Sequence, residues 1–182
     1  MAQKPWKPGK VVIISKGCHP YDGRDRVTPE NLKHDIEQSF ERLGTDYIDI
    51  YLMHRDDPKV EPGPMVEILN EYHKAGRIGA FGGSNWTHQR IAEANQYAGE
   101  HGLIPFTVSS PNFGLCDQIG DPWGGGPGCV TISGPSNAEA RAWYRDNQIP
   151  VLAYSSLGRG MFAGIVKSDD IEGRRKSWIR MQ

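Results

Sequence analysis

Residues 43–54 read LGTDYIDIYLMH and hold, in order, the end of a helix, an apolar strand and a polar residue that follows the strand. Gly44 is typical of the position just after a helix, where the left-handed backbone suits glycine. The run from Tyr47 to Met53 is rich in isoleucine and tyrosine, which favours a strand. His54 comes directly after this run. The order predicts an α/β fold in which functional side chains follow buried strands.

Three further strand-like runs end in the same way, with polar residues directly after the apolar ones. They are residues 11–14 before Ser15 and Lys16, residues 78–83 before Ser84 and Asn85, and residues 150–153 before Tyr154 and Ser155. In a parallel β/α barrel the carboxyl ends of the strands meet on one face, which holds the active site. We therefore expect Lys16, His54, the Ser84–Asn85 pair and Tyr154 to face one cleft.

Helical patterns alternate with these strands. Thr28 and Pro29 predict the start of a first helix, which Gly44 ends, while Thr87 and Ser136 predict the caps of two later helices. The expected apolar helix positions are Leu32, Ile36, Phe40 and Leu43; Met65, Ile68, Leu69 and Tyr72; Ile91, Ala94 and Tyr97; and Ala140, Trp143 and Tyr144. Two more strands are expected over residues 104–108 and 149–153. We predict one domain over residues 1–182, of the α/β class and the (β/α)8 TIM-barrel type, partial, with about five β/α units.

Composition excludes several classes of partner. The net charge of the 182-residue chain is −1, so no bulk field favours nucleic acid or an anionic membrane. The longest apolar runs are far shorter than a membrane span, and residues 1–10 are polar and unlike a signal peptide. Cys18, Cys116 and Cys129 are odd in number and lack CxxC spacing, which fits reduced thiols in a cytoplasmic protein. His19 beside Cys18 has no further ligands at metal spacing, so we expect no metal site.

A stretch rich in glycine and proline, residues 112–135, breaks the alternation of strands and helices. It contains no Gly-Lys-Ser/Thr and is therefore not a phosphate-binding P-loop. Long irregular loops inside a domain are usually functional or mobile. Phe113 and Trp123 in this stretch either wall a substrate pocket or cap the mouth of the barrel.

The residues at the strand ends suit one kind of chemistry. A partly buried Lys16 has a lowered pKa and can form a Schiff base or place positive charge beside an acid. His54 can orient a carbonyl, the Ser84–Asn85 pair can bind an amide, and Tyr154 offers a flat ring. Each residue alone has an ordinary role, such as a solvated lysine, a capping asparagine or a core tyrosine. Together they suit a planar carboxamide ring beside a carbonyl, whereas a Lys16 Schiff-base lyase leaves Asn85 and Tyr154 unexplained.

Four segments resemble the aldo-keto reductase family: residues 13–16, 43–54, 76–85 and 153–160. The similarity extends over about residues 11 to 165. It implies NADP(H)-dependent reduction of aldehydes and ketones, which are small carbonyl substrates, to alcohols. By this resemblance Lys16 lowers the pKa of a catalytic tyrosine and His54 polarises or orients the substrate carbonyl.

The same resemblance assigns the cofactor contacts. Ser84 and Asn85 hold the nicotinamide carboxamide, Tyr154 stacks on the ring, and Ser155 and Leu157 approach the pyrophosphate. The family's usual glutamine near the end of the fourth strand is replaced here by Ser109, with Ser110 and Asn112 as alternatives.

The sequence departs from the family pattern on either side of these segments. The family's catalytic tyrosine and its paired aspartate precede the lysine strand, and residues 1–10 contain neither type. Tyr21 is the nearest substitute, and the segment that grips the adenosine phosphate lies beyond the last strand. The isolated chain is therefore expected to have low activity. The alternative is a catalytically silent barrel fragment that binds nucleotide weakly or forms a homo-oligomer through open barrel edges.

Overall fold

The computed structural model describes residues 11–117, 128–158 and 161–165, and its centre is a parallel sheet. The strands are β1 (Ile14–Gly17), β2 (Ile48–Met53), β3 (Ile78–Ser84) and β4 (Val108–Ser110), in the order β1-β2-β3-β4. The helices are α1 (Pro29–Leu43), α2 (Gly63–Lys74), α3 (His88–Glu100) and α4 (Ala138–Asp146), with a 3₁₀ turn over Pro135–Asn137 and a short π-helical segment over Met161–Ile165. Every strand pair is parallel, which confirms the predicted α/β class.

The helix ends follow local signals in two cases. The Thr28 hydroxyl accepts the N–H of Asn31 at 3.2 Å, and α1 ends at Gly44, whose φ is 60°. The Thr87 hydroxyl likewise accepts the N–H of Arg90 at 3.3 Å. Side-chain oxygens of this kind satisfy backbone N–H groups that have no partner within the helix.

The predicted cap at Ser136 was wrong. Ser136 lies inside the 3₁₀ turn, and Asn137 precedes α4 without a side-chain cap bond. Pro135 explains the difference, because its fixed φ favours starting a tight turn directly after Gly134.

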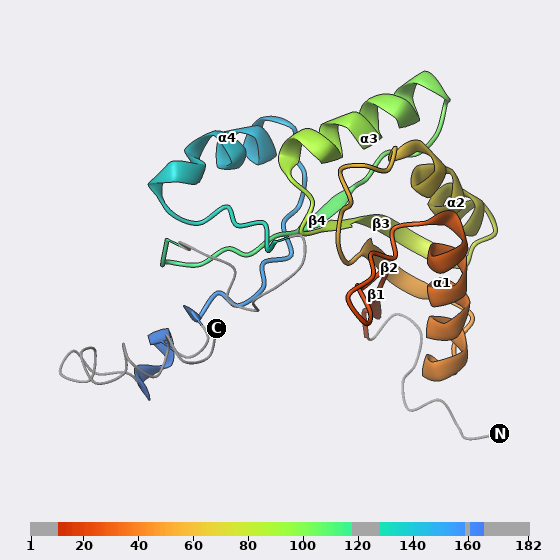
Figure 1. Ribbon diagram of the computed structural model, residues 1–182, viewed down its shortest axis with the longest axis horizontal. Coiled ribbons are helices and arrows are strands. Elements are labelled where there is room, and N and C mark those ends of the chain that lie inside the picture. The colour runs from red at the N-terminus through yellow and green to blue at the C-terminus, as the bar shows by residue number, and fades with distance from the viewer. Residues whose placement is uncertain (1–10, 118–127, 159–160, 166–182) are drawn as a thin grey trace.

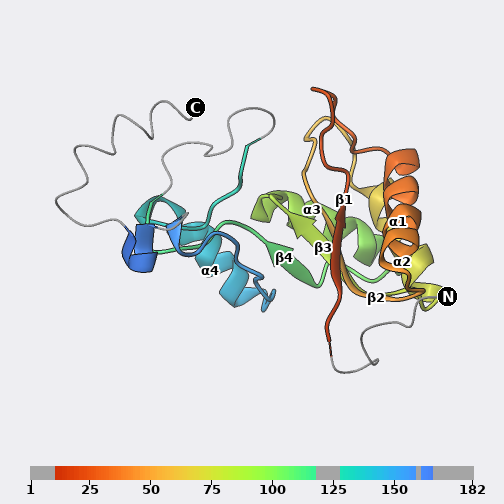
Figure 2. The same cartoon turned by 90° about the horizontal axis from the view of Figure 1, so that it is seen from below.

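The core lies between the sheet and the helices that cover one of its faces. Figure 2 shows α1 and α2 along this face, while Figures 1 and 2 both show α4 beyond the β4 side of the sheet. Large buried core residues include Leu32, Ile36, Phe40, Tyr51, Met53, Met65, Leu69, Phe81, Ile91 and Phe106. The predicted stripe of α1 is buried at its first three positions, while Leu43 is exposed.

The predicted fourth strand was misplaced and the predicted fifth is much reduced. Residues 104–106 do not join the sheet, because the side chains of Asn70 and Asn95 accept the N–H groups of Ile104 and Phe106, each at 2.8 Å. The strand forms over Val108–Ser110 instead. Residues 149–153 contribute a single bridge between Val151 and Ser109, so the sheet has four strands where about five were expected.

Strand β1 has an apolar outer edge. Within the described ranges it pairs only with β2; its first residue, Ile14, is 46% exposed, and Val12, two residues before the strand, is 64% exposed. Strand edges of this kind offer unpaired backbone groups to other chains.

We expect the purified chain to associate at micromolar concentration through this edge. Val12→Lys should shift sedimentation toward the monomer, because a charge on an edge strand opposes pairing. Leu43→Lys, which removes an exposed apolar residue at the end of α1, should leave the association unchanged. A compact monomer for the unmodified chain contradicts the prediction.

Gly17, the last residue of β1, lies close to side chains of β2 and α1. A Cβ atom built at Gly17 would lie 2.5 Å from the Tyr51 hydroxyl oxygen and 3.0 Å from the Asp35 Cβ. The lack of a side chain at Gly17 therefore allows β1 to approach its neighbours.

Gly17→Ala should destabilise the protein by about 1–3 kcal/mol, as overpacking of a filled core does. Gly99→Ala is the matched control, because Gly99 lies in α3 and a Cβ there meets no other atom within 4 Å. That control should be stabilising by about 0.5–1 kcal/mol through helix propensity. Urea unfolding measures both, and equal stability of Gly17→Ala and the unmodified chain contradicts the argument.

Candidate active site

Four polar side chains predicted from the sequence meet at the carboxyl ends of the strands. The Lys16 Nζ donates to the Ser84 Oγ at 3.2 Å and lies 5.8 Å from the centre of the Tyr154 ring. The Tyr154 hydroxyl donates to the Asn85 Oδ1 at 2.5 Å. The structure thus brings Lys16, Ser84, Asn85 and Tyr154 into one cluster.

The register of the strands explains the contact between Lys16 and Ser84. Lys16 pairs with Leu52, and Leu52 pairs with Gly82 of β3. Side chains alternate along a strand, so Ser84 shares the face of Gly82 and therefore of Lys16. Ser84 is fully buried, and its hydroxyl donates to the Ser110 carbonyl at 2.9 Å.

Ser109 is not brought into this cluster. It pairs with Gly83 and so lies on the opposite face of the sheet from Ser84 and Ser110. Its hydroxyl shares a hydrogen bond of 2.9 Å with the hydroxyl of Tyr144 on α4.

Asn85 connects four parts of the site through its side-chain amide. The oxygen accepts from the Tyr154 hydroxyl and from the Val130 N–H at 3.3 Å. The nitrogen donates to the His54 carbonyl at 3.1 Å and to the Ser84 Oγ at 3.3 Å. The residue has a φ of 58°, a left-handed conformation that asparagine tolerates better than most residues.

His54 follows β2, and its ring lies near the basic side chains of His19, Lys16 and Arg55. Its ring centre lies 4.5 Å from that of His19, which the sequence did not single out as a site residue. Burial first, and then the charges of His19, Lys16 and Arg55, lower the pKa of His54 to about 4. The imidazole is therefore neutral near pH 7 and can orient a carbonyl without carrying charge.

Lys16 shares this environment. Burial is the main cause that lowers its pKa, and the nearby positive charge of Arg55 adds to the effect. Arg55 itself donates toward the Cys129 sulfur at 3.9 Å. No pattern in the sequence marked Arg55, because its importance depends on which strand ends meet.

Asn112 and a tight turn fix the position of Tyr154 and the residues after it. The Asn112 Nδ2 donates to the Tyr154 carbonyl at 3.2 Å. Ser155 has a φ of 52° and its carbonyl accepts the Gly158 N–H at 2.9 Å. The Leu157 side chain between them is 59% exposed. This turn therefore presents backbone and side chains beside the Tyr154 ring.

Three further residues considered from the sequence are not part of the cluster as described. Tyr21 is 77% exposed and lies in a turn where its backbone pairs with that of Arg24, and no hydrogen bond joins it to Lys16. Phe113 is exposed, and Trp123 lies outside the described residues.

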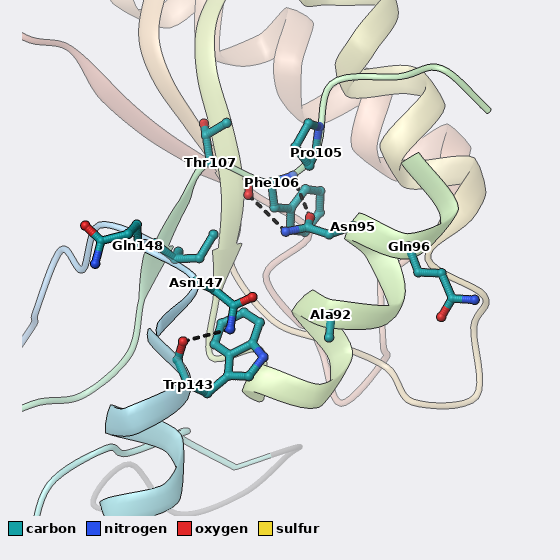
Figure 3. A pocket seen from close by; sticks show the side chains of 10 residues that line it. Ala92, Asn95, Gln96, Pro105, Phe106, Thr107, Trp143, Asn147 and Gln148 are labelled. Atoms are coloured by element: carbon teal, nitrogen blue, oxygen red, sulfur yellow. Dashed lines mark hydrogen bonds between the residues drawn. The ribbon is translucent and has the colours of Figure 1, made fainter. Parts of the chain in front are cut away.

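A groove of about 600 Å³ lies at the opposite, amino end of β4, between α3 and α4 (Figure 3). Its amides are used within the chain: the Asn95 side chain bonds both backbone groups of Phe106, and Asn147 donates to the Trp143 carbonyl. The groove lies at the other end of the strands from the polar cluster, and no Lys, His, Asp, Glu, Cys or Tyr side chain lines it. We therefore place the candidate site at the cluster.

In the described parts of the chain, no three His, Cys, Asp or Glu side chains are arranged to hold a metal ion. None of the helices described there has the length and apolar character needed to cross a membrane.

Comparisons with known proteins agree with the resemblance. A sequence model of the aldo/keto reductase family matches residues 2–178. An NADH-specific methylglyoxal reductase of Escherichia coli is 29% identical over 86% of this chain and 43% of that protein. An aldo-keto reductase of Bacillus subtilis is 28% identical over 87% of this chain and 42% of its own length. A 6-dehydroglucose reductase of Novosphingobium aromaticivorans is 30% identical over 55% of this chain and 33% of its own. The chain spans less than half the length of each of these relatives.

The environment of His54 predicts a measurable pH dependence. The pKa of this histidine is lowered from 6.5 to about 4 in the folded chain, so below pH 6.5 the unfolded chain binds the proton more readily. The free energy of unfolding should therefore fall as the pH drops from 6.5 to 4, and this contribution should be absent above 6.5.

Nuclear magnetic resonance of the His54 ring should show the low pKa directly. His54→Asn should reduce the dependence of the unfolding free energy on pH in this window, and His101→Asn, at the end of α3, serves as the control. A His54 ring that titrates near 6.5 contradicts the prediction.

Proposed function

The chain belongs to the aldo/keto reductase family, and on that premise we propose that its site serves the NADP(H)-dependent reduction of aldehydes and ketones to alcohols. The observation that carries this proposal is the cluster of Lys16, Ser84, Asn85 and Tyr154 at the strand ends. The resemblance assigns Ser84, Asn85 and Tyr154 of this cluster to the nicotinamide, and it assigns the neighbouring His54 to the substrate carbonyl. The consecutive parallel strands, with helices on one face, support an arc of a (β/α)8 barrel as the setting of this site.

The donor set fits a nicotinamide. Ser84 and Asn85 are buried and carry both donors and acceptors, which a carboxamide can match. The half-buried Tyr154 ring offers a stacking face, and the turn over Ser155 and Leu157 is suited to the pyrophosphate. When bound, the cofactor supplies or accepts the hydride. Ser109 remains a proposed contact, but its bond to Tyr144 favours Ser110 or Asn112 for that role.

The residues of the chain have separate tasks in this proposal. The neutral His54 ring donates a hydrogen bond to the substrate carbonyl oxygen and so orients it. The resemblance gives Lys16 the task of placing positive charge beside a catalytic tyrosine, whose pKa that charge lowers. Asn85 keeps the carbonyl of His54 in place through its bond of 3.1 Å.

The choice of nucleotide is a separate part of the proposal. The family resemblance favours NADP(H), whereas one relative is named as NADH-specific. Binding and turnover should therefore be measured with both NADPH and NADH. The substrate is proposed only as a class, the small aldehydes and ketones.

Titration of NADPH fluorescence with the 182-residue chain should show weak binding. Asn85→Ala should weaken it by at least about three- to tenfold, because each hydrogen bond lost costs about 0.5–1.5 kcal/mol and the Asn85 amide makes several. Asn147→Ala, in the groove at the amino end of β4, is the matched control and should bind as the unmodified chain does.

The same protein should oxidise NADPH slowly with 4-nitrobenzaldehyde, because Tyr21 is exposed and not bonded to Lys16, and the lack of a positioned general acid costs roughly 10²–10⁴-fold in rate. Binding without any turnover would favour a silent nucleotide-binding role. No binding of either NADPH or NADH contradicts the proposed function.

A further inference from the structure

The segment between β2 and α2, residues 54–62, is held mainly by hydrogen bonds from α3 and from the turn that precedes α3. It begins with His54 and Arg55, which belong to the candidate site. Its own backbone contributes a short turn in which the Val60 N–H donates to the Asp57 carbonyl at 2.9 Å. We call it the 54–62 loop. The backbone of His54 is held at the end of β2, where its N–H donates to the Gly17 carbonyl at 2.7 Å. The residues after it lack regular structure, so contacts with other elements fix the course of the loop.

Arg90 of α3 makes the strongest set of contacts with this loop. Its Nε and Nη2 bind the two carboxylate oxygens of Asp56 at 2.9 and 3.1 Å. The Nη2 also donates to the Val60 carbonyl at 2.8 Å. The Arg90 and Asp56 side chains are only 13% and 8% exposed. A two-pronged bond of this kind fixes direction as well as distance.

The β3–α3 turn completes the attachment. The Trp86 Nε1 donates to the Arg55 carbonyl at 3.0 Å, and the neighbouring Asn85 Nδ2 donates to the His54 carbonyl at 3.1 Å. The Arg90 guanidinium lies 5.5 Å from the centre of the buried Trp86 ring. Arg90 thus contacts both the loop and the residue that holds the start of the loop.

We propose that Arg90 is a positioning residue, whose ion pair with Asp56 holds the 54–62 loop so that His54 and Asn85 keep their places in the site. The consequence for catalysis rests on the function proposed above, whereas the consequence for the position of His54 does not. Without Arg90 the buried Asp56 carboxylate would lose its cationic partner. A buried unpaired carboxylate is costly, so Asp56 would turn toward water and carry the loop with it.

Three variants test this role. Arg90→Gln removes the charge, Arg90→Lys keeps it but cannot form the two-pronged bond, and Asp56→Asn removes the charge of the partner while keeping its size. Arg145→Gln is the control, because Arg145 forms an exposed pair with Asp146 on α4. Melting temperatures establish that each variant is folded.

Two readouts by nuclear magnetic resonance report on the site and not on global stability. The first is the pKa of the His54 ring, which faces His19, Lys16 and Arg55 and is about 4 in the unmodified chain. Arg90→Gln and Asp56→Asn should raise it toward 6.5 as water reaches the ring. The second is solvent exchange of the Trp86 indole N–H, which should become about tenfold faster as the bond to Arg55 loosens.

Arg90→Lys should lie between the unmodified chain and Arg90→Gln in both readouts, and Arg145→Gln should change neither. A folded Arg90→Gln or Asp56→Asn with an unchanged His54 pKa and an unchanged exchange rate overturns the inference.

NADPH titration separates the two proposals. If the unmodified chain binds, Arg90→Gln should bind about tenfold more weakly. If it binds no nicotinamide nucleotide, the proposed function fails, and the two resonance readouts still decide the role of Arg90.

Discussion

The side-chain amide of Asn85 is the interaction on which the rest of the site depends. It accepts from Tyr154 and Val130 and donates to His54 and Ser84, so it joins the ends of β2 and β3 to two later segments. Only an amide carries two donors and an acceptor with two lone pairs in one flat group. An aspartate of the same shape would lose both donors and would add a negative charge beside the site. The left-handed backbone at Asn85 aims this group inward, which a β-branched residue could not do without strain.

Burial gives the site its electrostatic character. Lys16 and His54 both have lowered pKa values, chiefly because each is removed from water, and Arg55 lowers both further. Shifts that combine desolvation with a specific charged neighbour are typical of functional sites. Away from the cluster, the buried cation Arg90 is paired with Asp56 and also donates to the Val60 carbonyl, so its contacts are with the 54–62 loop. The guanidinium of Arg90 thus binds the 54–62 loop, while that of Arg55 lowers the pKa values of Lys16 on β1 and of His54 at the start of the loop.

Local signals predicted much of the fold, and tertiary contacts account for the errors. Thr28, Gly44 and Thr87 act within one turn of a helix, so the sequence suffices to find them. The strand expected over residues 104–108 failed because Asn70 and Asn95, distant in sequence, take its N–H groups. In the site, Lys16, Ser84, Asn85 and Tyr154 could be found because each follows an apolar run. The direction of the Ser109 side chain required the register with β3, and His19, Arg55 and Arg90 leave no pattern that could mark them.

If the site binds the carboxamide proposed above, the position of Tyr154 explains how it would do so. No strand leads to this residue: a single bridge and the amide of Asn112 hold its backbone, while Asn85 holds its hydroxyl. A carboxamide that binds Asn85 must compete with the Tyr154 hydroxyl for the same oxygen. Such an exchange replaces one hydrogen bond with another, so its net cost is small, about 0.5–1.5 kcal/mol at most. The backbone of Tyr154 stays held by the bridge to Asn112 and by the Asn112 amide during this exchange. The hydrogen bond between Tyr154 and Asn85 therefore holds the Tyr154 ring in place in the absence of a ligand, and a carboxamide could replace it at small cost.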